Sequence, residues 1–206
     1  MDNALDIATE FLTDAEIESL GKHLDKYKEL HERDAHQNSF LDFVNHVWPS
    51  FITGNHHKIF ADKLERVANG ELKRLIVNMP PRHTKSEFAS YLFPAWVMGK
   101  SPSTKIIQAT HTAELAVGFG RKVKNLLDSD IYRDVFPKME LAKDAKASGR
   151  WSTNEGGEYY AVGVGGALAG RGANLCIIDD PVSEQDALSP TALDNIYEWY
   201  TSGPRQ

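Results

Sequence analysis

Short apolar runs that alternate with helix-like segments constrain the fold of this 206-residue chain more than any other feature. Apolar runs predict strands at residues 72–78, 105–109 and 175–178, and residues 150–153 and 158–164 read as a strand pair. Helical spacing predicts helices at residues 85–98, 112–127 and 189–200. Strands that alternate with helices favour an α/β fold, a mostly parallel sheet with helices on both faces.

A helical lead-in precedes this unit. Thr13 can cap a helix over residues 14–33, and Glu16 has the spacing of a capping box. Apolar residues then recur at helical spacing along that segment. Two more helices are predicted, at residues 39–47 and 55–69.

Domain organisation and charge follow the same division. We expect a helical lead-in at residues 1–55 and a larger domain at residues 56–206.

The net charge is −6, yet residues 71–150 hold 14 Lys and Arg against 8 Asp and Glu. That basic block either faces the phosphates of nucleotide or DNA or consists of solvated helix faces. Lys and Arg at residues 121–124 are candidate DNA contacts.

Several classes of protein are disfavoured by composition. No apolar run approaches the ~20 residues that a membrane span needs, and Met1–Thr13 carries acids rather than the features of a signal peptide. We therefore expect a cytoplasmic protein. The single cysteine, Cys176, excludes an intrachain disulfide, and its apolar run predicts a small buried side chain. The histidines lack the spacing of a structural zinc site.

The first candidate site reads MPPRHTKS and lies between the strand at 72–78 and the helix at 85–98. A phosphate-binding loop joins a strand to a helix through Lys-Ser or Lys-Thr, so that backbone N–H groups surround the phosphates. Lys85 would contact the β and γ phosphates, and Ser86 would bind Mg²⁺. Met79 and Thr84 replace the two glycines of the usual pattern. The alternative is a proline turn before a helix with a surface lysine.

The second candidate site reads NLCIIDDP and follows the strand at 175–178. Asp179 at the strand end would hold Mg²⁺, and Asp180 would orient or deprotonate the attacking water. In an open α/β sheet both sites would lie at the carboxyl ends of strands, where ligands bind. The alternative is a strand followed by an acidic turn.

A glycine-rich segment, VGVGGALAGRG, covers residues 162–172 between the two sites. Its glycines permit tight turns and close approach of the backbone. Arg171 projects from it. The side chain is either a surface charge or an arginine finger that acts on a neighbouring subunit.

At this point the chain resembles a known family. The strings LIVNMPPRHTKSE and GVGGALAGRGANLCIIDDP are similar to those of the large terminase subunits of tailed bacteriophages, over roughly residues 40–206. The resemblance implies a P-loop NTPase fold of the additional-strand catalytic glutamate class, which uses ATP and Mg²⁺ to drive double-stranded DNA into a procapsid. It also implies a location in the host cell cytoplasm. The implied partners are a portal protein, on which monomers assemble into a ring, and a small terminase subunit.

The resemblance assigns roles to individual residues. Lys85 and Ser86 match the phosphate and Mg²⁺ positions, and Asp179 matches the metal-binding acid. The remaining matches are the phosphate-sensing Arg82, the loop positions His83 and Thr84, the trans-acting Arg171, and His57, which loosely matches an adenine contact.

Three departures from the family pattern matter. Thr84 stands where a glycine is usual. Asp180 stands where many motors have Glu, which leaves Glu184 as an alternative catalytic acid. The family continues into a coupling motif and a nuclease domain, so we expect this chain to be a fragment without nuclease activity.

Three other functions remain open. A helicase-like ATPase would usually show a GxGKT loop and a DExx box, which this chain lacks. A non-catalytic module could keep the fold as a docking surface. A stand-alone metal nuclease would need acids from several separated strands, and only Asp179, Asp180 and Glu184 are candidates.

Overall fold

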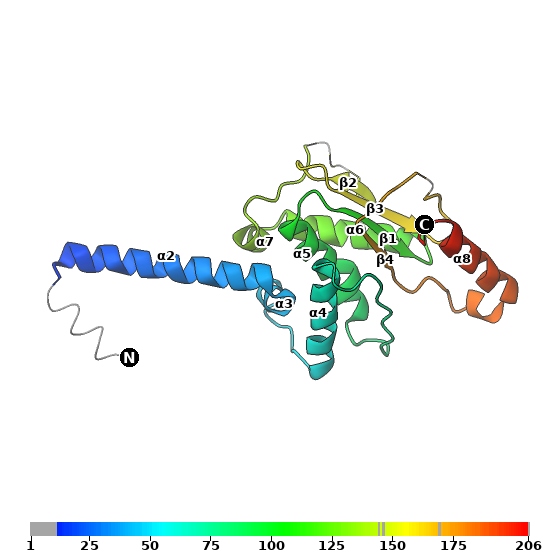
Figure 1. Ribbon diagram of the computed structural model, residues 1–206, viewed down its shortest axis with the longest axis horizontal. Coiled ribbons are helices and arrows are strands. Elements are labelled where there is room, and N and C mark those ends of the chain that lie inside the picture. Colours follow the sequence, from blue (N-terminus) through cyan, green and yellow to red (C-terminus); the bar gives the residue numbers. More distant parts are fainter. Residues whose placement is uncertain (1–11, 144, 146, 169, 206) are drawn as a thin grey trace.

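The N-terminal helix α2 (Asp14–Asn38) projects from the body of the protein. The structure is a computed structural model that describes residues 12–143, 145, 147–168 and 170–205. The predicted capping box is present, because the Glu16 carboxylate accepts a hydrogen bond from the Thr13 N–H at 2.8 Å. No residue of α2 is buried, and Tyr27 is 67% exposed. The apolar stripe of α2 is therefore exposed to solvent, on a helix that extends away from the rest of the protein (Figure 1).

The main core is formed by helices that pack around aromatic rings. The Phe40 ring meets the Phe88 ring edge-on, with 5.5 Å between centroids, and both side chains are fully buried. The helix at 39–47 thus belongs to the same core as the segment after Lys85. The predicted helix at 85–98 is π-helical in its first part, a form that is frequent at functional sites. These core elements are α3 (Phe40–Val47), α4 (Asn55–Ala68), the π-helix η1 (Glu87–Leu92) and α5 (Phe93–Lys100).

A four-stranded sheet has the order β2-β3-β1-β4. The central strand β1 is parallel to both β3 and β4, and β2 runs antiparallel to β3. The predicted mostly parallel α/β architecture is therefore confirmed. The strands are β1 (Lys105–Thr110), β2 (Arg150–Ser152), β3 (Glu158–Gly163) and β4 (Leu175–Ile178).

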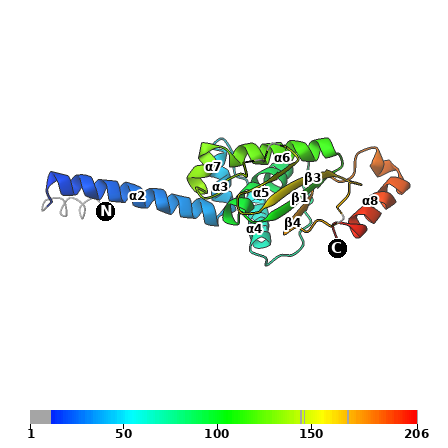
Figure 2. The same cartoon turned by 90° about the horizontal axis from the view of Figure 1, so that it is seen from above.

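The two faces of the sheet are covered unequally. Helix α6 packs along one face (Figure 2), and the other face is covered in the described residues mainly by Leu168 and by Trp199 of α8. The expected helices on both faces are therefore only partly present. Cys176 lies on the less covered face beside Ile107 and is exposed, so the prediction that it is buried was wrong. The remaining helices are α6 (Ala113–Leu127), α7 (Asp130–Val135), the 3₁₀ turn η2 (Asp186–Leu188) and α8 (Pro190–Ser202).

The predicted strand at residues 72–78 does not form. The segment has no regular secondary structure, although Leu75 and Val77 pack against the core while Ile76 between them is 88% exposed. This alternation is the burial pattern of a strand. A strand also needs a neighbour to pair its N–H and C=O groups. Within the residues that the structure describes, no strand pairs with this segment.

Candidate functional site

The two motifs predicted from the sequence meet at one end of the sheet. The Lys85 ammonium forms an ion pair with Asp180 and lies 3.5 Å from Oδ1 of Asp179, although Lys85 and Asp180 are 95 residues apart in the chain. Partial burial lowers the pKa of Lys85, but the hydrogen bond to Asp180 and the charges of both carboxylates outweigh it and raise the pKa overall. Lys85 is therefore a fixed cation between two acids.

A buried chain of hydrogen bonds holds the Asp179 carboxylate in place. The Ser90 hydroxyl of η1 donates to Oδ2 of Asp179 at 2.8 Å, and the Gln108 amide of β1 donates to Ser90 Oγ at 3.2 Å. Ser90 and Gln108 are fully buried, and Asp179 is 6% exposed. A carboxylate in this setting keeps one orientation, because its hydrogen-bond partner is itself fixed by packing.

Sequence reasoning missed Ser90 and Gln108. Gln108 did carry a signal, since it is a polar residue inside the apolar run KIIQAT. A buried side-chain amide requires partners, and Gln108 Oε1 has none among the described residues. Ser90 carried no comparable signal, because a serine on a helix has no required partner.

Backbone strain is concentrated in the two loops of this cluster. Among the described residues, the non-glycine residues with positive φ are Arg82 at 63°, Thr84 at 61° and Asp180 at 45°. A β-branched residue in the left-handed region is a genuine outlier. Thr84 therefore adopts the conformation for which the usual pattern has glycine. Such strain typically gathers at functional sites, where the surrounding structure holds it in place.

His57 supports the strained loop from inside the protein. Its Nε2 lies 2.8 Å from Thr84 Oγ1, and its Nδ1 accepts the Gly54 N–H at 2.8 Å. Since the Thr84 hydroxyl donates to the His83 carbonyl, Nε2 must carry a proton and Nδ1 must not. The buried His57 is thus a neutral imidazole that supports the loop, and the adenine contact that the resemblance loosely implies for it stays a prediction.

Replacing His57 by glutamine should flatten the pH dependence of stability. Burial lowers the pKa of His57, and the nearby His56 and His83 lower it further. The unfolded chain then binds the proton at a higher pH than the folded chain. The contribution of neutral His57 to the free energy of unfolding is fully present above about pH 6.5, the pKa of an unfolded histidine. It is lost as the pH falls from there through the lower pKa of the folded state. Melting temperatures from about pH 7 to about pH 5 should fall less in H57Q than in wild type.

A matched control is His23→Gln, which changes an exposed histidine of α2. The variant H23Q should keep the wild-type slope. An H57Q slope equal to that of wild type would mean that folding does not lower the pKa of His57.

Asp179 is the carboxylate of the cluster that could hold a magnesium ion. In the described residues no group of three or more His, Cys, Asp or Glu could hold a metal ion. Mg²⁺ commonly binds one or two carboxylates and completes its shell with phosphates and water. The buried Asp179 carboxylate fits that limited role, and Ser86, which follows Lys85 in the chain, is the hydroxyl ligand predicted from the sequence.

The side chains of three predicted residues form no hydrogen bond or ion pair with Lys85, Asp179 or Asp180 in the described structure. Arg82 and His83 are exposed on the loop, and the His83 ring bonds only to the Pro81 carbonyl, at 2.9 Å. Glu184 is exposed on the turn before η2. Asp180 rather than Glu184 therefore lies beside Lys85.

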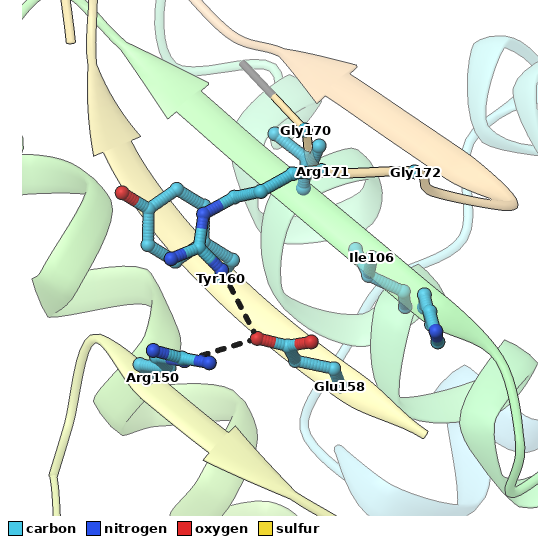
Figure 3. Close-up of a pocket in the computed structure, with 9 residues that line it drawn as sticks. Ile106, Arg150, Glu158, Tyr160, Gly170, Arg171 and Gly172 are labelled. Atoms are coloured by element: carbon cyan, nitrogen blue, oxygen red, sulfur yellow. Dashed lines mark hydrogen bonds and ion pairs between the residues drawn. The ribbon is translucent and has the colours of Figure 1, made fainter. Parts of the chain in front are cut away.

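Arg171 lies at the opposite end of the sheet. Its Nη1 donates to Glu158, the first residue of β3, at 3.2 Å, and its guanidinium stacks on Tyr160 at 3.8 Å from the ring centroid (Figure 3). Asp179 instead follows the last residue of β4. The six residues of β1 separate the two ends by roughly 17–20 Å, at about 3.3 Å per residue. Arg171 therefore cannot contact a phosphate bound at Lys85 of its own chain.

Comparison of the chain with models of protein families, with curated proteins and with solved structures finds no match. Among the described residues no helix has both the length and the apolar character to cross a membrane.

Proposed function

We propose that this chain is the ATP-hydrolysing domain of a large terminase subunit, with a P-loop NTPase fold. The observation that carries the proposal is the meeting of Lys85 with Asp179 and Asp180 at the carboxyl ends of the strands. An ammonium beside two acids, next to a strained loop that leads into a helix, is the arrangement that phosphoryl transfer needs. The sequence segments around both loops, which resemble those of large terminase subunits, support the same function.

Each residue has a distinct part in the proposed reaction. Lys85 would leave Asp180 and bind the β and γ phosphates, while Asp179 and Ser86 would hold Mg²⁺, which neutralises charge that develops on the phosphates. Asp180 would orient the water and accept its proton. The water oxygen then bonds to the γ phosphorus as the bond to the bridging oxygen breaks, which releases ADP. Glu184 is the second candidate for the proton acceptor.

The partners belong to the same proposal. Hydrolysis would move double-stranded DNA into a procapsid in the host cell cytoplasm, with subunits arranged as a ring on the portal and loaded by the small terminase subunit. A ring would also allow Arg171 to act across a subunit interface, as predicted from the sequence, provided that it leaves Glu158.

A second candidate function is a non-catalytic docking module with the same fold. The observation in its favour is that Lys85 is already bound by two carboxylates. A phosphate could reach the ammonium only after the pair with Asp180 breaks.

Calorimetric titration of this chain with ATP, in the presence and absence of Mg²⁺, separates the two functions. We expect binding that is tighter with Mg²⁺, together with a rise in melting temperature. Ligand at one hundred times its dissociation constant stabilises the fold by about 2.7 kcal/mol. A folded chain that binds no nucleotide under either condition would favour the docking module.

A further inference from the structure

A recess opens at the amino-terminal ends of the parallel strands, on the less covered face of the sheet. Its volume is about 350 Å³, within the range of small-ligand sites. The polar side chains that line it are Lys105 of β1, Arg150 of β2, Glu158 and Tyr160 of β3, and Arg171 of the glycine-rich segment. Figure 3 shows that both guanidinium groups point toward Glu158.

Positive charge exceeds negative charge in this recess. Three cations and a single carboxylate line it, which leaves a formal charge of +2 among the lining side chains. Oε1 of Glu158 accepts from Arg150 Nε at 3.0 Å and from Arg171 Nη1 at 3.2 Å. Each guanidinium has five N–H donors, so most of them are not used in these bonds. Lys105 forms no side-chain ion pair within the described part of the chain.

Arg171 is held in place before any ligand arrives. Stacking on Tyr160 and the bond to Glu158 fix the plane of its guanidinium, and its side chain is still 30% exposed. A guanidinium that is already oriented loses less conformational freedom when it binds an anion. Arg150 is 62% exposed and provides a second fork at the edge of the recess.

Stability alone does not account for this arrangement. The two ion pairs could act as a clamp that joins β2, β3 and the glycine-rich segment. Exposed ion pairs typically contribute about 0–1 kcal/mol each. One carboxylate also cannot neutralise three cations, and the mutual repulsion of the cations opposes folding. A second anion in the recess would remove that cost.

We propose that this recess binds a phosphate ester. Paired guanidinium groups match phosphate oxygens in charge and in geometry, and Lys105 adds a point charge beside them. Two sources share this chemistry, the backbone of double-stranded DNA and a free nucleotide. The site lies roughly 17–20 Å from Lys85 by the length of β1, so the proposal does not rest on the ATPase function.

The test removes two cations that lie outside the proposed catalytic residues. The double variant Lys105→Gln/Arg150→Gln is compared with Lys28→Gln/Lys138→Gln, which changes net charge equally at two exposed lysines outside the recess. In the first arm, a labelled DNA duplex is titrated by fluorescence anisotropy at several salt concentrations. The slope of log affinity against log salt should fall by about 1–2 in the recess variant, since each lost phosphate contact removes about 0.9. The control variant should keep the wild-type slope.

The second arm measures ATP binding by calorimetry in a Lys85→Ala background. If a free nucleotide is the ligand, binding should survive this change and be lost when the recess variant is added. Either arm that separates the recess variant from the control supports the proposal and identifies the source. Equal behaviour of the two double variants in both arms would overturn it.

Two further measurements keep the result interpretable. Melting temperatures report whether the double variant folds. If it does not fold, the single variant Lys105→Gln replaces it, because the Lys105 side chain makes no ion pair in the described residues. Wild-type protein that binds duplex DNA through the recess but binds no ATP would count against the proposed ATPase and leave the recess proposal standing.

Discussion

Replacing Lys85 by alanine is expected to abolish ATP turnover and to weaken sharply the binding of ATP at the cluster of Lys85, Asp179 and Asp180. The ammonium is the one cation that contacts both acids of the cluster in the described structure. Without it, the phosphates would face two carboxylates and lose the positive charge that lies between them. Loss of one preorganised electrostatic contact typically costs 10²–10³ in rate, so turnover should fall at least about 100-fold. Phosphate release reports turnover, and calorimetry on this chain reports binding.

The matched control is Lys63→Ala, which removes another lysine paired with a neighbouring acid, Asp62, at 2.8 Å. That variant should keep wild-type binding and turnover. Because K85A also leaves the buried Asp179 without its ammonium, folding must be verified by thermal melting. A folded K85A protein with unchanged turnover would refute the phosphate-loop assignment.

Replacing Asp179 by asparagine should remove the Mg²⁺ dependence of nucleotide binding. The change keeps the size of the side chain but removes the buried charge that would hold the metal. We expect ATP affinity in the variant to be nearly the same with and without Mg²⁺, and turnover to fall about 100-fold or more. Calorimetric titrations at increasing Mg²⁺ concentration provide the measurement.

The variant Ser90→Ala tests the orientation of Asp179 separately from its charge. It removes the 2.8 Å hydrogen bond and leaves the carboxylate in place. Loss of about 1.4 kcal/mol of orienting interaction corresponds to about a tenfold higher requirement for Mg²⁺. Turnover at saturating Mg²⁺ should then recover toward wild type.

An Asp179→Asn protein with a normal Mg²⁺ response would exclude Asp179 as a metal ligand.

The candidate site could be predicted in part because its two loops carry strong local signals. Lys85 follows a loop that leads into a helix, and Asp179 and Asp180 follow an apolar run, so their chemistry can be read from neighbouring residues. That they would meet was an inference from the rule that ligands bind at the carboxyl ends of parallel strands. The hydrogen-bond chain beneath Asp179 followed no such rule, because Ser90 and Gln108 belong to other elements.

The glycine position shows a different limit. Thr84 departs from the residue pattern of a phosphate-binding loop, yet its φ of 61° is that of a glycine position. A pattern of residue types indicates the backbone conformations of low energy. The folded protein can hold a strained conformation when the surrounding packing compensates for it. Here His57 bonds to the Thr84 hydroxyl from within the core.

The sequence by itself determined where most of the helices begin and the four strands of the sheet, whereas α2 continues to Asn38, past its predicted end at residue 33, and α7 was not predicted. Thr13, Ser39 and Thr112 each cap a helix through a bond to a residue three positions later, and such contacts depend only on nearby residues. Tertiary structure alone decided that residues 72–78 pair with no strand of the described structure and that Arg171 lies far from Lys85. Strand pairing and the end of a sheet at which a side chain lies depend on register and crossover between distant segments, which no local pattern encodes.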